Sequence, residues 1–115
     1  MTATTGGSGT TVSIHATFPD LATAERVGRD VVESGLAACV NILPGARSIY
    51  RWKGAIETAD EVVAFFKTRG DLADRLCGAI AERHPYDTPA IVVLPVVGGS
   101  TRYLDWIVAE TAGVR

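Results

Sequence analysis

The chain has 115 residues, a length that suits one compact domain. Hydrophobic residues make up 47% of it and charged residues 21%, an ordinary globular composition with enough apolar material for a core. The formal net charge of −2 argues against binding through phosphate contacts, so we expect no nucleic-acid partner. The apolar runs are far shorter than the roughly 18 residues of a bilayer-spanning helix, so we expect no membrane partner.

The first ten residues differ in composition from the rest of the chain. Residues 1–10 (MTATTGGSGT) offer almost nothing to bury, which predicts a disordered tail. Residues 11–115 are predicted to form the single domain. Its cysteines, Cys39 and Cys77, form no CxxC pair, and no charged stretch followed by an apolar one opens the chain. Both observations predict reduced thiols in a cytoplasmic protein.

A strand is predicted over residues 11–18, where apolar and polar residues alternate. Asp20 follows as a plausible N-cap, and apolar residues from Leu21 onward recur at helical spacing. Gly35 stands where a glycine in the left-handed region would end that helix.

The next segment reads as a strand over 36–42 that pairs again over 47–52. Pro44-Gly45 separates the two parts and predicts a bend or bulge, because proline cannot donate to a sheet hydrogen bond. Lys53-Gly54 predicts a tight turn that returns the chain along the same ribbon. A third main strand is expected over 61–68.

A second amphipathic helix is predicted over 71–84 and is stopped by Pro85. A fourth strand over 89–97 and a short helix over 103–108 complete the chain. The order is β-α-β-β-α-β with a terminal helix, which predicts an α+β, ferredoxin-like βαββαβ fold.

Two strands are apolar on both faces. Residues 62–66 and 91–94 are apolar at consecutive positions, whereas two crossover helices can cover only one face of the sheet. An uncovered apolar face favours self-association. The alternative is a monomer in which the terminal helix and the ribbon over 47–57 fold across that face.

His84-Pro85-Tyr86 is the most distinctive local motif. A histidine at a helix end suits a general base, a metal ligand, or a group that only satisfies the last helix carbonyls. The chain contains no HxH, HExxH or CxxC pattern, so a metal site would combine distant segments or different subunits. His15, the other histidine, is expected to face solvent or a subunit contact. No nucleophile elbow accompanies the serines or cysteines, so we predict no enzymatic activity.

Aromatic residues on the predicted strands allow a second interpretation, because ferredoxin-like sheets can stack RNA bases. Tyr50, Trp52, Phe65 and Phe66 are the residues concerned. The negative net charge and the lack of a basic-aromatic run favour their burial at a subunit interface instead.

Several blocks of the sequence appear in the same order in a known family. Residues 37–42 (AACVNI), Pro44-Gly45 and residues 48–54 (SIYRWKG) form the first block. His84-Pro85-Tyr86 with Thr88-Pro89, and then residues 103–106 (YLDW), follow it. In these motifs the chain resembles the CutA divalent-cation tolerance family, over about Val12 to Glu110.

The resemblance implies a ferredoxin-like fold in a tight homotrimer, with no enzymatic reaction and no obligatory cofactor. It also implies a cytoplasmic role in tolerance of copper and other divalent cations. The metal ligands proposed for the family are a first-strand cysteine, the histidine of His-Pro-Tyr and an acidic residue after Thr-Pro. Only His84 is present here, because Ala16 and Ala90 occupy the other two positions. We therefore predict weak metal binding through His84, with Asp87 close enough in sequence to lend an oxygen.

A further prediction places five of the matched residues around a groove between subunits: Lys67, His84, Tyr86, Asp105 and Trp106. Two alternatives to metal tolerance remain. A PII-like sensing trimer of the same topology would bind nucleotides at its subunit clefts. An acylphosphatase-type enzyme would need an arginine-bearing anion cradle after the first strand, where residues 17–20 (TFPD) offer none.

Overall fold

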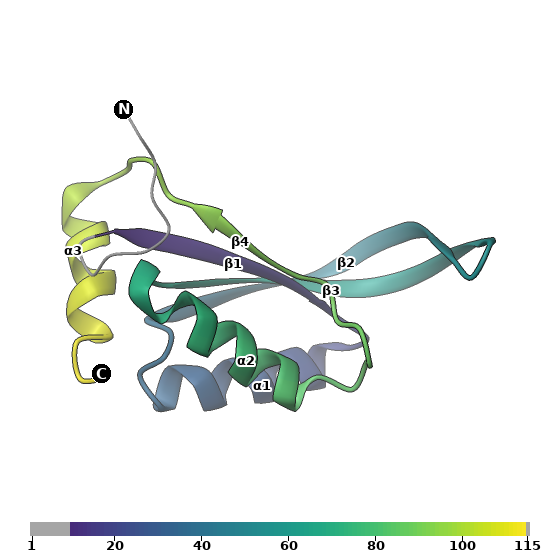
Figure 1. The fold of residues 1–115 in the computed structure, drawn as a ribbon, viewed down its shortest axis with the longest axis horizontal. Coiled ribbons are helices and arrows are strands. Elements are labelled where there is room, and N and C mark those ends of the chain that lie inside the picture. Colours follow the sequence, from purple (N-terminus) through teal and green to yellow (C-terminus); the bar gives the residue numbers. More distant parts are fainter. Residues whose placement is uncertain (1–9, 115) are drawn as a thin grey trace.

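The computed structural model describes residues 10–114, which form one four-stranded sheet with helices packed on one side (Figure 1). Apart from Thr10, the predicted tail at residues 1–10 lies outside the described residues. The elements are β1 (Thr11–Phe18), α1 (Leu21–Glu33), β2 (Cys39–Trp52), β3 (Ala55–Arg69), a short 3₁₀ turn (Gly70–Leu72), α2 (Ala73–Arg83), β4 (Ile91–Pro95) and α3 (Thr101–Glu110).

All strand pairs are antiparallel, and the strands lie in the order β2-β3-β1-β4. In Figure 1, α1 and α2 run together under one face of the sheet, while α3 lies at the end of the sheet where β1 begins. The β2–β3 hairpin projects from the opposite end. The predicted mixed fold of four antiparallel strands and helices is therefore confirmed.

The start of α1 follows from the chemistry of its cap. The Asp20 carboxylate accepts a hydrogen bond from the Thr23 backbone N–H at 2.8 Å, which satisfies one of the unpaired donors of the first turn. That bond also lowers the pKa of Asp20. At the other end Gly35 adopts a φ of +80°, as predicted for a residue that ends a helix.

The core lies between the helices and one face of the sheet. Every second residue of β1, and of residues 62–68 in β3, is buried there, and the intervening residues point to the other face. Aromatic rings from the two central strands meet in this layer, with the centroids of Phe18 and Phe66 6.4 Å apart. The fully buried apolar residues include Val12, Ile14, Phe18, Ala24, Val27, Val31, Ala64, Phe66, Leu76 and Ile80.

The β2–β3 hairpin is longer than the sequence indicated. β3 is a single strand from Ala55 to Arg69, whereas the sequence predicted a return of residues 55–57 along the ribbon and a separate main strand over 61–68. The predicted bulge is confirmed, because the register of β2 on β3 shifts between Leu43 and Ala46. The predicted turn is also confirmed: both of its central residues, Lys53 and Gly54, have positive φ angles of 49° and 83°.

Two other boundaries differ from the prediction. β4 covers Ile91–Pro95 rather than residues 89–97, and its last pair with β1 is Pro95 with Val12. The second helix begins with a 3₁₀ turn and ends at Arg83, so His84 is its C-cap in an extended conformation. The following proline explains that conformation, since it disfavours a helical residue before it.

Helix α1 lies close to β2 at Gly28. A methyl group added at Gly28 would lie 2.9 Å from Cγ1 of Val40, a side chain with little freedom to move. A residue larger than glycine would therefore push the helix from the sheet.

We predict that Gly28→Ala lowers the free energy of unfolding by about 1–3 kcal/mol, the usual cost of overpacking a core contact. Gly78→Ala is the matched control, because Gly78 lies inside α2 with no atom within 4 Å of the added methyl. Helix propensity should make that control up to about 1 kcal/mol more stable. Urea unfolding at a fixed protein concentration measures both, and an unchanged midpoint for Gly28→Ala would contradict the packing argument.

Candidate functional site

The face of the sheet opposite α1 and α2 is apolar and uncovered in a single chain. The register places Val92, His15, Phe65 and Asn41 side by side across the four strands. Val92 is 54% exposed, and Leu43 and Leu94 on neighbouring rows are similarly open. The prediction that both faces of these strands are apolar is confirmed.

His15 lies in the middle of this open face. Its ring is tilted against Phe65 with 4.3 Å between centroids, and the Lys67 ammonium lies 5.8 Å from the centre of the Phe65 ring. Lys67 also donates a hydrogen bond to the Asn41 side chain. Partial burial, and then the nearby positive charge of Lys67, lower the pKa of His15. The folded protein therefore favours the neutral form of His15 more than the unfolded chain does.

We predict that acidification destabilises the wild-type protein more than His15→Gln. The folded state lowers the pKa of His15 below its ordinary 6.5, so the unfolded chain binds the proton more readily. The stability that the neutral His15 ring contributes is complete above pH 6.5. It is lost as the pH falls from 6.5 through the lower pKa of His15 in the folded protein. Melting temperatures at pH 7.5 and pH 5.5 check this. An identical drop in both proteins would contradict it.

His84 is buried beneath the loop that follows α2. Its Nε2 lies 2.6 Å from the Thr17 carbonyl oxygen, and its Nδ1 accepts a hydrogen bond from the Tyr86 backbone N–H at 3.2 Å. Because a backbone N–H can only donate, the proton of the neutral ring is on Nε2, which donates to Thr17. The ring also stacks on Phe18, with 4.8 Å between centroids. His84 thus joins the end of α2 to the end of β1.

The other two ligand positions of the family offer no donor. Ala16 points into the core with 2% of its surface exposed, and Ala90 lies at the entry to β4. Among residues 10–114, no group of three or more His, Cys, Asp and Glu side chains is arranged to hold a metal ion. Of the three ligand positions, one chain therefore fills only that of His84, whose ring nitrogens are both already hydrogen-bonded.

The predicted groove residues fall into two groups at opposite ends of the sheet. His84 bonds to β1 near its last residue, whereas Lys67 pairs with Ser13 near the start of β1. Asp105 and Trp106 lie on α3, which is at the Lys67 end (Figure 1). A groove that contains all five residues would need a second copy of the chain.

α3 is tied to the sheet by its aromatic residues. The Tyr103 hydroxyl and the Cys39 sulfur are 3.4 Å apart, and the Tyr103 ring stacks on Trp106 at 5.8 Å. The hydrogen bond between the Tyr103 hydroxyl and Cys39, together with burial, raises the pKa of Tyr103 to about 12. The phenol is therefore neutral at physiological pH.

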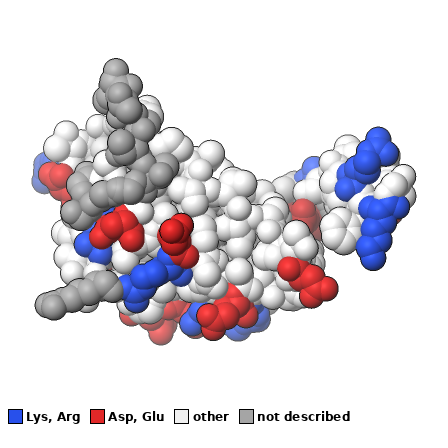
Figure 2. Space-filling view, in the orientation of Figure 1, with Lys and Arg blue, Asp and Glu red and all other residues white. Residues whose placement is uncertain are grey.

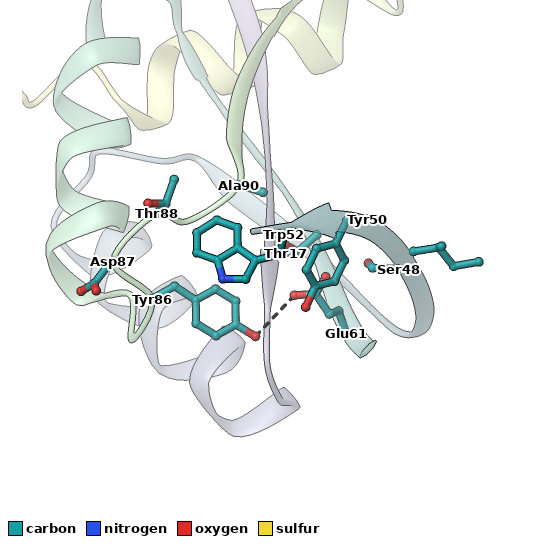
Figure 3. Close-up of a pocket in the computed structure, with 10 residues that line it drawn as sticks. Thr17, Ser48, Tyr50, Trp52, Glu61, Tyr86, Asp87, Thr88 and Ala90 are labelled. Atoms are coloured by element: carbon teal, nitrogen blue, oxygen red, sulfur yellow. Dashed lines mark hydrogen bonds between the residues drawn. The ribbon is translucent and has the colours of Figure 1, made fainter. Parts of the chain in front are cut away.

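A pocket of about 680 Å³ lies where the β2–β3 hairpin meets the end of β1 and the loop after α2 (Figure 3). The sequence interpretation had singled out Tyr50, Trp52, Tyr86 and Asp87 for separate reasons, and the structure brings them together. It missed Glu61, although the alternation of β3 places that residue on the open face. The residues that line the pocket are Thr17, Ser48, Ile49, Tyr50, Trp52, Glu61, Tyr86, Asp87, Thr88 and Ala90.

The pocket is aromatic and acidic. The Tyr86 hydroxyl lies 3.5 Å from Oε2 of Glu61, and burial and that carboxylate raise the pKa of Tyr86. None of the residues that line the pocket is Lys, Arg or His. In Figure 2, Lys and Arg side chains lie on the outer part of the hairpin and also on the body of the molecule. The Lys53 ammonium lies 5.9 Å from the centre of the Trp52 ring, at the edge of the pocket.

Comparison with known proteins places this architecture in a family. The model of the CutA1 divalent ion tolerance proteins matches residues 12–110, almost all of the described chain. The chain belongs to the CutA1 family. CutA1 proteins include a divalent-cation tolerance protein from Pectobacterium atrosepticum that is 45% identical over 99 residues, or 86% of this chain and 90% of the relative.

Two further CutA1 relatives support the assignment. A chloroplastic CutA protein of Arabidopsis thaliana is 35% identical over 87% of this chain, which spans 55% of that protein. The crystal structure of CutA from Xylella fastidiosa superposes with a TM-score of 0.86 at 40% identity and covers 88% of this chain and 97% of that one. The matches give no support to the PII-like alternative. In the described part of the chain, no helix is long and apolar enough to cross a membrane.

Proposed function

We propose that this protein acts in tolerance of divalent cations, copper in particular, by binding rather than by catalysis. The CutA1 match over residues 12–110 carries the proposal, because it spans both the fold and the His84 motif. The relative from Pectobacterium atrosepticum is named for divalent-cation tolerance and not for a reaction. A single domain over residues 11–115 is part of the same proposal.

We also propose a ferredoxin-like protomer assembled as a homotrimer. The open sheet face supports this assembly, because its apolar side chains would otherwise remain exposed to water. They include Leu43, Val92 and Leu94. Covering such a face with copies of itself is the economical solution for a small chain. A cytoplasmic location is proposed on the ground that Cys39 and Cys77 are both free, as in a reducing compartment.

Light scattering should give a particle of about three times the 12.1 kDa chain mass. Val92→Asp should shift the population toward monomer, because a carboxylate on the buried face would lose its hydration. Val97→Asp is the control, since Val97 is similarly exposed, at 56%, but lies beyond β4. A 12.1 kDa wild-type particle would contradict the assembly and its apolar-face argument.

The proposed metal contact is His84, and the hydrogen bonds at its ring explain why binding would be weak. Nδ1 is the nitrogen with a free electron pair, and that pair accepts the Tyr86 N–H. A cation at Nδ1 would have to displace this bond and move the Tyr86 loop. A second ligand would then come from Asp87, another copy of the chain, or water.

Calorimetric titration with Cu(II) tests this contact. His84→Gln should weaken binding at least about tenfold, because the variant lacks the imidazole but keeps an amide that can donate to Thr17. His15→Gln is the matched control, since His15 is the only other histidine. Unchanged Cu(II) affinity in His84→Gln, or equal loss in both variants, would remove His84 from the proposal. Circular dichroism verifies that each variant is folded.

A further inference from the structure

His15 is a titratable group in the middle of the apolar sheet face. The register places it between Phe65 on β3 and Val92 on β4, with Asn41 on the strand beyond Phe65. The helices α1 and α2 pack on the opposite side of the sheet (Figure 1). None of the three residues that face His15 carries a carboxylate, so the strands around it provide no counter-charge for a protonated ring.

The charge that acts on His15 has the same sign as a protonated imidazole. The other titratable groups on the elements that border this face are Cys39 on β2, Glu61, Lys67 and Arg69 on β3, and Tyr103 and Asp105 on α3. Of these, the Lys67 ammonium acts on His15, and its positive charge opposes protonation. It lies 5.8 Å from the centre of the Phe65 ring against which His15 packs. Glu61 instead lies 3.5 Å from the Tyr86 hydroxyl.

Covering this face makes a protonated His15 costly. In a single chain the face is open, with Val92 54% exposed, so water can hydrate an imidazolium there. Once another copy packs on the face, that hydration is lost while Lys67 remains beside the ring. Two like charges also repel more strongly where water is excluded. Protonation therefore favours separate chains, and association favours the neutral ring.

We propose that His15 makes the association of copies of this chain pH-dependent: the apolar faces pack while the imidazoles are neutral, and protonation separates them. This inference rests on the proposed homotrimer and concerns its regulation. Each copy brings one His15, so three protonation equilibria multiply in one trimer. Association is strongest above pH 6.5, the ordinary histidine value, and weakens as the pH falls below it.

Subunit exchange between trimers tests the proposal. Equal amounts of unlabelled and isotope-labelled full-length protein are mixed, and native mass spectrometry follows the appearance of mixed trimers. We expect wild-type exchange to be at least about tenfold faster at pH 5.5 than at pH 7.5. His15→Gln, and His15→Leu as a second neutral replacement, should exchange at rates that agree within about twofold at the two pH values.

Ser13→Ala is the matched control, because Ser13 lies two residues from His15 on the same face of β1 and does not titrate. It should keep the acid acceleration of the wild type. Equal wild-type rates at the two pH values, or undiminished acceleration in His15→Gln, would overturn the pH switch and leave the trimer in place. Loss of the helical circular dichroism signal at pH 5.5 would assign the acceleration to unfolding and would also overturn it. A 12.1 kDa particle at pH 7.5 would instead remove the homotrimer itself.

Discussion

Packing of α1 and α2 against a single face of the sheet is the constraint on which the other features of this protein depend. The layer buries Phe18 and Phe66 together with the aliphatic residues of both helices. Each such side chain contributes about 1.5–3 kcal/mol when it leaves water, which fixes the alternation of β1 and β3. The same alternation leaves the apolar partners of those residues on the opposite face. One helix layer thus stabilises the chain and creates the surface that a second copy would cover.

The same packing separates the residues expected to act together. β1 runs from one end of the sheet to the other. Lys67 and α3 lie near its first residues, and His84 lies near its last. His84 is bonded at both nitrogens and stacked on Phe18, so it holds the end of α2 to the sheet. The residue that carries the family resemblance is therefore also a structural link. A metal ion competes with that role, which is the physical reason to expect low affinity from one chain.

The aromatic pocket arises from irregularities in the hairpin. The register shift after Leu43 and the tight turn at Lys53-Gly54 set the course of the long β2–β3 ribbon. Along that ribbon Tyr50 and Trp52 reach the loop that holds Tyr86. Glu61 joins them because it occupies an odd position of β3, on the open face of the sheet. The pocket therefore combines three segments that are far apart in the sequence.

The secondary-structure elements and their periodicity could be predicted from the sequence alone, because they depend on local chemistry. Asp20 begins a helix, Gly35 ends it, and Pro44-Gly45 shifts the register of a strand, each through interactions within a few residues. The apolar residues on both faces of the strand at residues 62–66 could also be predicted from the sequence. Packing between distant segments, by contrast, is what gives both nitrogens of His84 a hydrogen-bond partner and brings Glu61 to Tyr86. Those contacts join residues 25 or more positions apart, or depend on how a loop settles on a strand end, and no periodicity encodes such a distance.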